Sequence, residues 1–384
     1  MRFLHTADWH LGRHFEGRSL EPDHAAILEQ VLAAVVTHEP DALIVAGDIF
    51  DRTTPPESAV RQLNDFIRRL TSQTDAAIVL IAGNHDSGDR IGAMATLADP
   101  RRALVRGPLM ADEPPLLLED AHGSVAISAL PFGYEFAARE CFASADIRQP
   151  ADVLRAEIAA ARRHVPAGAR WVVTAHGFAD GASTSDAERP LSRVVGGIET
   201  IPADVFDGAN YVALGHLHRP QIIGSERIRY AGAPLAFGFD EEGNEKSFAM
   251  IDMDGQGAIT TTLLPFAPIR HVRTLRGSLD DIIATGKGHA SDDFIKVILT
   301  DAERRIDPIK RIREHYPNAC SLSYERDATA LETKSARPSA SALADPAEVV
   351  AEFLAFSLGR PPSEAETHII AAELAAMSAK DAAA

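Results

Sequence analysis

Five short polar segments, each at or near the end of an apolar run, constrain this chain more than any other feature. In chain order they are Asp8-Trp9-His10, Gly47-Asp48-Ile49-Phe50-Asp51, Gly83-Asn84-His85-Asp86, His176-Gly177 and Gly215-His216-Leu217-His218. The preceding runs are rich in Val, Ile, Leu and Ala, which predicts buried strands. Sites on open α/β sheets form in the loops that follow strands. The pattern therefore predicts that these polar side chains lie at strand ends and in the loops that follow them, where they form one site.

The residue types in these segments are those that bind divalent metal ions. The candidate ligands are Asp8, His10, Asp48, Asn84, His176, His216 and His218. Asp8 and His10 are two residues apart, so in an extended segment both would point the same way, and His216 and His218 share this spacing. Mixed imidazole and carboxylate ligands favour manganese, iron or zinc over calcium. The segments contain no cysteine, which argues against a structural zinc site.

A pair of metal ions requires an anion that bridges them. Two divalent ions about 3.5–4 Å apart supply hydroxide at neutral pH and absorb charge during phosphodiester hydrolysis. Asp48 is the candidate bridge, and Gly47 allows the chain to turn sharply before it. His85 adjoins Asn84 and is expected near the phosphate, as a charge stabiliser or general acid, with Asp86 orienting its ring.

Several further polar residues have two readings. For Asp51 and Asp86, a role in a turn or helix start is as well supported as a role behind the metal ligands. The scattered histidines are interpreted as surface or satisfied core residues; they are His5, His14, His24, His38, His122 and His164.

Residues 1–266 show the alternation of an α/β domain. Residues 23–38 and 58–70 carry apolar side chains at helical spacing. Buried strands alternating with helices predict sheets covered on their faces. The strands from Val125 onward are expected to build a second sheet, and the runs 227–230 and 247–251 close the domain.

Residues 268–327 predict a small split β-α-β domain with strands over 269–275, 294–299 and 320–324. Ser278, with Asp281 three residues later, is expected to cap its first helix, and Asp307 followed by Pro308 to cap its second. A basic cluster lies beside the second helix: Arg304, Arg305, Lys310, Arg311 and Arg313. It is a candidate contact for a phosphate backbone, and a solvated helix face is the alternative.

The C-terminal residues are expected to dock on another surface. Residues 328–346 are rich in Ala, Ser and Pro and are interpreted as a linker. Two short helices are predicted within 347–379, with these apolar residues: Val349, Val350, Phe353, Leu354, Leu358, Ile369, Ile370, Leu374 and Met377. Two short helices do not bury such residues alone. They pack on the parent domain or on a partner, and the linker favours the partner.

Composition limits the class of protein and its location. The chain has 384 residues, 46% hydrophobic and 24% charged, which suits a globular protein of two or more domains. Its two cysteines, Cys141 and Cys320, imply no disulfide framework and fit a reducing cytoplasm. There is no run of about 18 apolar residues and no signal-peptide pattern at the start. The net charge of −17 argues against tight, independent binding of long duplex DNA.

The motifs resemble those of a known family. The matching stretches are residues 4–13, 47–52, 83–87, 211–221 and 229–235. On these residues the chain is similar to the SbcD subunits of bacterial SbcCD nucleases, which are calcineurin-like metallophosphoesterases. The run Gly215-His216-Leu217-His218-Arg219-Pro220-Gln221 separates them from generic phosphoesterases. Ala233 and Asp240 depart from the pattern, which predicts serine and glutamate there.

The resemblance implies a four-layer αββα metallophosphoesterase sandwich followed by the capping domain and the helical pair. One ion would take Asp8, His10, Asp48 and His218, and the other Asp48, Asn84, His176 and His216, with His85 as the catalytic histidine. The expected metal is Mn²⁺, and the expected substrates are DNA double-strand ends, hairpins and single strands. An SbcC-type ATPase would bind the C-terminal helices, with two copies of each subunit. This predicts an exonuclease and endonuclease of DNA repair, recombination and replication, cytoplasmic and associated with the nucleoid.

Two other classes of function compete with this interpretation. A metallophosphoesterase acting on a small-molecule phosphodiester or a phosphoprotein would have the same metal centre, and the acidic charge favours it. The basic cap, the C-terminal helices and the run 215–221 favour the nuclease. A non-catalytic scaffold would lack one of the ligands, and none is missing.

Overall fold

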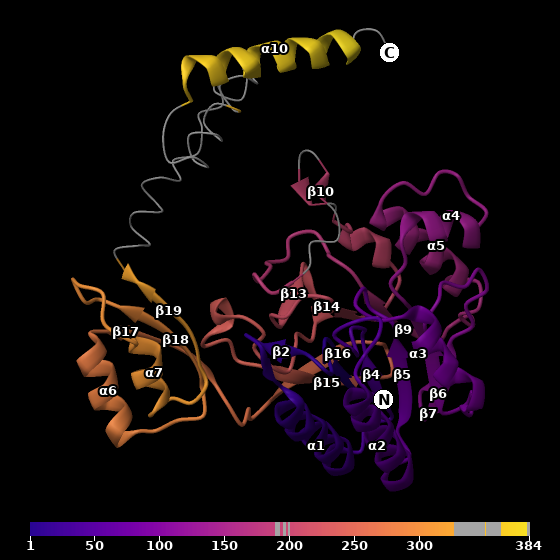
Figure 1. Cartoon of the computed structure of the whole chain (residues 1–384). Coiled ribbons are helices and arrows are strands. Elements are labelled where there is room, and N and C mark those ends of the chain that lie inside the picture. Colours follow the sequence, from indigo (N-terminus) through magenta and orange to yellow (C-terminus); the bar gives the residue numbers. More distant parts are fainter. Residues whose placement is uncertain (189–192, 195–196, 199, 326–349, 351–361, 382–384) are drawn as a thin grey trace. The chain divides into compact units, whose positions relative to one another are not determined.

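The computed structural model describes residues 1–188, 193–194, 197–198, 200–325, 350 and 362–381 (Figure 1). It forms two compact units, Met1–Leu322 and Ser323–Ala384. The first unit contains two six-stranded sheets and a smaller three-stranded sheet.

The first sheet has the strand order β16-β15-β1-β4-β5-β6. Four neighbouring strands are parallel: β1 (Arg2–Thr6), β4 (Ala42–Val45), β5 (Ala77–Ile81) and β6 (Ala103–Arg106). Every residue of β4 and β5 is buried. Strands buried on both faces are apolar throughout, which explains the continuous runs in the sequence.

The second sheet has the order β13-β14-β12-β9-β8-β7. Its strands are β7 (Leu116–Asp120), β8 (Gly123–Leu130), β9 (Arg170–His176), β12 (Tyr211–Gly215), β13 (Gln221–Ile223) and β14 (Ser225–Tyr230). Strands β8, β9, β12 and β14 are parallel neighbours. The expected second sheet is therefore confirmed for the strands from Val125 to Tyr230.

The assignment of the last strands to the second sheet is wrong. Strands β15 (Ser247–Met253) and β16 (Ile259–Pro265) join the first sheet, with β15 antiparallel to β1. Strand β1 has β4 on one side only, so its other edge needs a partner for its backbone groups. The ammonium group of Met1 donates to the carbonyl of Met253 (2.9 Å), which holds this edge. Strand β7, which precedes Val125, belongs to the second sheet.

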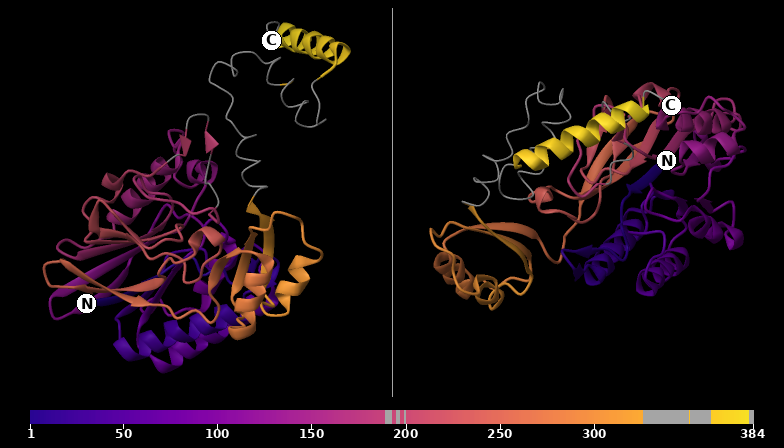
Figure 2. Two further views of the ribbon diagram at one scale, coloured as in Figure 1. Left: turned by 90° about the vertical axis from the view of Figure 1, so that its left-hand side faces the viewer. Right: turned by 45° about the horizontal axis from the view of Figure 1, so that its top comes forward.

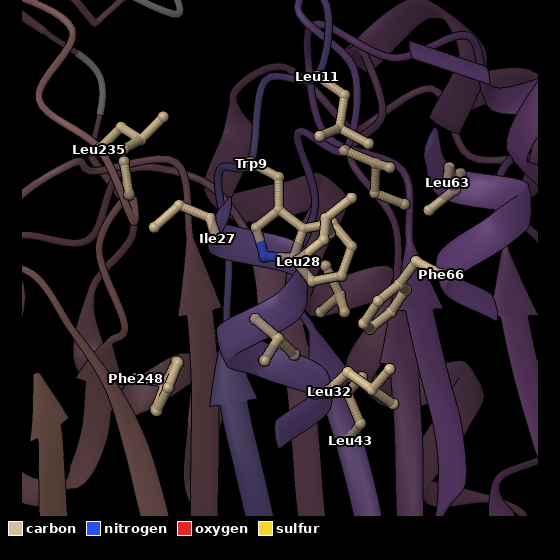
Figure 3. Close-up of a cluster of buried hydrophobic side chains, with 14 of the residues drawn as sticks. Trp9, Leu11, Ile27, Leu28, Leu32, Leu43, Leu63, Phe66, Leu235 and Phe248 are labelled. Atoms are coloured by element: carbon tan, nitrogen blue, oxygen red, sulfur yellow. The ribbon is translucent and has the colours of Figure 1, made fainter. Parts of the chain in front are cut away.

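The layers are arranged as expected. Helices α1 (Glu21–His38) and α2 (Glu57–Gln73) lie side by side against the first sheet. Trp9, Leu32, Leu43, Leu63 and Phe66 are among the residues of this apolar layer (Figure 3).

Helix α5 (Pro150–Arg162) covers the second sheet with Leu154 and Ile158. The two sheets pack on each other through side chains such as Phe3 and Ile44 from one and Ile127 and Val172 from the other. The predicted αββα sandwich is confirmed.

The remaining elements of this domain are short. They are β2 (His14–Phe15), β3 (Arg18–Ser19), α3 (Gly88–Ala93), η1 (Met94–Leu97), α4 (Glu135–Cys141), β10 (Arg193–Val194), β11 (Gly197–Ile198), η2 (Ala203–Phe206) and η3 (Phe239–Glu241).

The small domain contains the predicted elements in the predicted order. They are β17 (Val272–Gly277), α6 (Leu279–Gly288), β18 (Phe294–Leu299), α7 (Pro308–Arg313) and β19 (Ala319–Tyr324), with α6 and α7 packed together (Figures 1 and 2). The split arrangement is wrong, because β17 pairs directly with β18 in parallel. Ser278 caps α6 by accepting from the amide of Asp281 (3.2 Å). Asp307 precedes α7 in a left-handed conformation (φ 46°) and makes no side-chain capping bond.

The basic cluster is partly neutralised by acids of the same domain. Arg305 pairs with Asp301 (2.6 Å) and with Asp280 (3.1 Å), and Arg311 lies 3.5 Å from Asp280. These pairs favour the solvated helix face over a phosphate contact for these two arginines.

The small domain packs on the sandwich within the first unit. The ring of Phe15 stacks on that of Phe294, with centroids 4.7 Å apart. Arg270 forms an ion pair with the buried carboxylate of Asp23. Apolar and ionic contacts thus both join the two domains.

In the second unit the structure describes helix α10 (Glu364–Asp381). Ile370 on this helix is buried, and Ile369 is 63% exposed. The predicted linker 328–346 lies outside the described residues, and so does nearly all of the first of the two helices predicted within 347–379. Within the described part of the chain, no helix combines the length and apolarity that crossing a membrane requires.

Candidate metal centre

The five polar segments meet where the parallel strands of both sheets end. Asp8, Asp48 and Asn84 follow strands of the first sheet, and His176 and His216 lie at the ends of paired strands of the second. The amide of Asp8 donates to the carbonyl of Gly47 (3.0 Å), which joins the first two segments. Two sheets and five loops therefore contribute to one site.

The carboxylate of Asp48 lies at the centre of the site. Its Oδ2 is 3.5 Å from Nε2 of His176 and 3.7 Å from Nε2 of His10. Asp8, His10 and Asp48 offer ligand atoms that all lie within 4.8 Å of one another, and so do Asp48, His176 and His216. Asp48 is common to both groups, which is the position that a bridging ligand needs.

Asn84 connects the two histidines of the second sheet. Its Oδ1 lies 3.0 Å from Nε2 of His176 and 3.0 Å from Nδ1 of His216. Nδ1 of His176 donates to the carbonyl of Ala46 (2.9 Å), which leaves Nε2 as the nitrogen that faces the site. Three candidate ligands thus converge on one point beside Asp48.

His218 approaches from the other side. Its ring packs edge-on against that of His10, with centroids 5.2 Å apart. Its Nδ1 lies 3.4 Å from Oε1 of Glu241, so Nε2 is the nitrogen left for a metal ion. The structure therefore brings all seven candidate ligands together.

Four of these ligands have a left-handed backbone. The φ angles are 53° at Asp8, 47° at His10, 49° at Asp48 and 106° at His216. L-residues rarely adopt such angles, and they gather at functional sites where the surrounding structure enforces them. The expected extended alternation of Asp8 and His10 is wrong, because turns rather than strand pleating aim these side chains.

Gly47 and Gly83, which directly precede Asp48 and Asn84, are required by close packing as well as by the turn of the backbone. A Cβ on Gly47, where φ is +89°, would overlap Nδ1 of His176. A Cβ on Gly83 would overlap the carboxylate of Asp48. The loops can approach this closely only with glycine at both positions.

The donor set fits divalent metal ions. Both ring nitrogens of His10 are buried and have no hydrogen-bond partner within the described part of the chain. Leaving a buried polar group unsatisfied costs about 1–3 kcal/mol, and a metal ion on this ring would remove part of that cost. Imidazole, carboxylate and amide donors suit a transition-metal ion of the manganese, iron or zinc kind.

The charges of the site also require cations. Burial opposes ionisation of Asp48, but the neighbouring rings of His176 and His10 outweigh it and hold its pKa well below the usual value. Burial raises the pKa of Asp8 well above its usual value, and the charge of Asp48 adds to this. Burial also lowers the pKa of His216 to about 3. Burial opposes protonation of His176, but Asp48 outweighs it and raises the pKa of that ring to about 9, so the buried charge of Asp48 needs a neighbouring cation, either this ring or a bound metal ion.

The ring of His85 is held by the main chain. Its Nδ1 donates to the carbonyl of Asp51 (2.8 Å), and its amide donates to Oδ1 of Asp48 (2.8 Å). Its Nε2 is thereby placed 4.0 Å from Oδ2 of Asp48. This geometry places Nε2 of His85 beside the candidate ligands.

The expectation that Asp86 orients this ring is wrong. The carboxylate of Asp86 instead accepts from the amides of Ile49 (3.0 Å), Phe50 (2.8 Å) and Gly83 (2.9 Å). Burial, followed by the charge of Asp48, raises its pKa to about 7. Asp86 therefore ties together the loops that carry Asp48 and Asn84.

Asp51 supports a ligand. Its Oδ1 lies 3.8 Å from Nδ1 of His10 and accepts from Nη1 of Arg13 (3.1 Å). Of the two roles considered for Asp51, the structure fits support of a metal ligand rather than a role in a turn or helix start.

Sequence reasoning missed the residues that hold His218. Glu241, fully buried, contacts its ring and forms an ion pair with Lys246. Lys246 donates to the backbone carbonyl of His218 (2.9 Å), and the carboxylate of Glu188 accepts from the backbone amide of His218 (2.6 Å). The family resemblance predicts glutamate at position 240 and so draws attention to this stretch, but it does not mark Glu241 itself.

Phe237 was missed as well. Its ring lies edge-on to His10 (centroids 5.1 Å apart) and to His218 (5.2 Å). The guanidinium of Arg13 lies 4.6 Å from the centre of this ring. Phe237 thus fills the space behind two candidate ligands, and no motif marks it.

Comparison with protein families agrees with the fold and the site. The sequence model of calcineurin-like phosphoesterases matches residues 1–220, more than half of the chain and every candidate ligand. The chain belongs to the calcineurin-like phosphoesterase family and is a hydrolase of phosphoesters.

A second model, SbcD_C, described as the type 5 capsule protein repressor C-terminal domain, matches residues 265–357. The two matches in this order support an SbcD-type nuclease subunit, which confirms the resemblance seen in the motifs.

Proposed function

We propose that this chain is the nuclease subunit of a DNA-processing complex, hydrolysing phosphodiester bonds at double-strand ends, hairpins and single strands. The observation that carries this proposal is the carboxylate of Asp48, which two groups of candidate ligands share. The SbcD-type match supports the further proposal that the chain acts as an exonuclease and endonuclease in repair, recombination and replication.

The proposed ligand sets are those that the family resemblance implies, and the two groups that share Asp48 support them. One ion would be held by Asp8, His10, Asp48 and His218, and the other by Asp48, Asn84, His176 and His216. When bound, two divalent ions, which we propose to be Mn²⁺, supply a hydroxide at neutral pH and neutralise charge on the phosphate.

The chain's own groups orient the reaction. The amide of His85 holds Oδ1 of Asp48 in place. Its ring, fixed by the carbonyl of Asp51, directs Nε2 into the site, where it stabilises charge on the phosphate or protonates the leaving oxygen.

The proposed organisation is a nuclease domain over residues 1–266, a capping domain over 268–327, a linker over 328–346 and helices over 347–379. The SbcD_C match extends to residue 357 and supports a partner of the SbcC ATPase type. We place the contact with this ATPase on the C-terminal helices, in an assembly with two copies of each subunit.

A phosphoesterase acting on a small molecule or a phosphoprotein is the second candidate. The net charge of −17 favours it, because nucleic acid repels acidic surfaces. The SbcD_C match favours the nuclease.

The test compares Asp48→Ala with Asp65→Ala, an exposed aspartate on α2. We expect Asp48→Ala to abolish Mn²⁺-dependent cleavage of hairpin DNA while its circular dichroism stays native, and Asp65→Ala to cleave normally. Near-normal turnover by Asp48→Ala would refute the two-metal assignment. Wild-type activity on phosphopeptides but not on any DNA would favour the second candidate.

A further inference from the structure

Three aromatic side chains form a path from the metal centre to the surface. Phe132 lies in the loop after β8, and Tyr134 and Phe136 lie where α4 begins. The ring of Phe132 is edge-on to that of His176 (centroids 6.4 Å apart) and to that of Tyr134 (4.9 Å). Tyr134 and Phe136 are nearly parallel, with centroids 5.6 Å apart and planes at 12°. Each ring therefore contacts the next, from a candidate ligand outward.

Exposure increases along this path. His176 is buried, Phe132 is half-buried, and Tyr134 and Phe136 are 50% and 65% exposed. Helix α4 already has its own apolar contacts, through Ala138 packed with neighbours that include Ile147 and Val153. Two adjacent aromatic rings left in water forgo the gain of burial, and a contiguous exposed apolar patch marks a contact surface.

The inner end of the path is fixed to the loop that carries the site. The amide of Phe132 donates to the carbonyl of Ala82 (2.9 Å), which directly precedes Gly83 and Asn84. Gly133 packs so closely on Leu109 that a Cβ at this position would overlap that side chain. The backbone at Phe132 and Gly133 thus keeps a set position relative to the candidate ligands.

We propose that Tyr134 and Phe136 are a stacking platform for unpaired bases of the strand whose phosphate lies in the metal centre. This rests on the proposed nuclease function and adds the residues that select its substrate. Stacking on aromatic rings needs no cation, so it gives a chain of net charge −17 a way to hold nucleic acid. The continuity of the rings with His176 favours a nucleic acid over a protein partner, which would have no need to reach the metal centre.

The charges around the platform restrict which part of a nucleotide it could hold. Glu135 lies between the two rings in sequence, and Glu140 is exposed on the same helix. Arg139 donates to the carbonyl of Ile147 (2.8 Å). The platform is therefore not a phosphate-binding surface, and a base is the part of a nucleotide that it suits.

The platform implies a preference for unpaired strands. Bases in a duplex are stacked on each other, whereas those of a frayed end, a single strand or a hairpin loop can turn onto a protein ring. Stacking contributes about 1–3 kcal/mol per base, so losing both rings should weaken binding of an unpaired strand by roughly tenfold or more.

The experiment uses the full chain with Mn²⁺ and compares Tyr134→Ser/Phe136→Ser with Leu117→Ser, which removes a half-exposed apolar side chain from β7. We expect the double variant to raise KM about tenfold or more for a single-stranded oligonucleotide. For the same strand made abasic near the cleavage point, the double variant and the wild type should have the same KM. Tyr134→Trp/Phe136→Trp should restore the wild-type KM, and Leu117→Ser should keep it.

Binding is measured separately with a 2-aminopurine oligonucleotide, whose fluorescence falls when the base stacks. Equal quenching by wild type and the double variant, or an equal loss on normal and abasic strands, would overturn the platform. The platform would also be overturned if the double variant cleaved DNA normally but no longer bound a protein partner or vesicles. A wild-type chain that cleaves no DNA would instead overturn the proposed function.

Discussion

Glu241→Gln tests how the site holds His218. The carboxylate of Glu241 is fully buried, contacts the ring of His218 at 3.4 Å and accepts from the amide of Phe237 (3.2 Å). It also pairs with Lys246, whose side chain is 6% exposed. Burial opposes the charge of Glu241, but His218 and Lys246 outweigh it and lower its pKa to about 2. Glutamine keeps the size of the side chain, removes the charge and replaces one acceptor oxygen with a donor NH2 group.

Two separate losses are expected. Removing one partner of a buried ion pair costs about 3–5 kcal/mol of unfolding free energy, because Lys246 keeps an uncompensated charge. A histidine ligand that loses its orienting carboxylate typically loses about 10–100-fold in metal affinity. Glu241→Gln/Lys246→Met should recover most of the stability, because no charge is left unpaired, but it should not recover the metal affinity.

The assays are urea unfolding of the metal-free chain and calorimetric titration with Mn²⁺. Glu245→Gln, an exposed neighbour, is the control and should match wild type in both. The reasoning is refuted if Glu241→Gln binds two Mn²⁺ ions as tightly as wild type. It is also refuted if the double variant regains full metal affinity together with its stability.

Three further predictions concern other parts of the chain. His85→Ala should retain two Mn²⁺ ions per chain by elemental analysis while turnover falls about 10²–10⁴-fold. Burial raises the pKa of Glu157 well above its usual value, and the charge of Glu113 adds to it. A raised carboxyl pKa gives stability that is present below about 4.5 and is lost as the pH rises through the folded value, so Glu157→Gln should raise Tm at pH 8 but not at pH 4. A chain ending before Pro338 should still cleave a short single strand with Mn²⁺ but should not associate with an SbcC-type ATPase.

Each of these has a contrary outcome. Loss of an ion from His85→Ala would make that residue a ligand. An equal Tm gain at pH 8 from Glu140→Gln, an exposed site on α4, would attribute the effect to surface charge. Undiminished co-purification of the shortened chain with the ATPase would move the contact away from the C-terminal helices.

The order of the small domain shows what local signals can and cannot predict. Each of its strands and helices carries its own mark, such as the cap of α6 by Ser278 or the run Phe294–Leu299. The direct pairing of β17 with β18 has no such mark. Strand order depends on which edges pair and bury most surface, and this is a property of the whole sheet.

The candidate ligands could be predicted because their signal is local. Apolar runs form parallel strands, and the polar residues that follow the strands of one sheet lie at the same edge of that sheet. The meeting of these edges from two sheets depends on how the sheets pack. His218 and Asp48 were therefore found from short motifs alone.

What only the tertiary structure decided is how these ligands are aimed and supported. The left-handed turns at Asp8 and His10 are enforced by neighbouring loops rather than by their own residue types. Glu241 reaches His218 across 23 residues, and Phe132, which follows β8, meets His176 at the end of the neighbouring strand β9. The sequence by itself determined which residue types stand at the strand ends, since hydrophobic periodicity is read within a few residues. Contacts between distant segments form only when the sheets pack, because burial and close approach depend on the whole core.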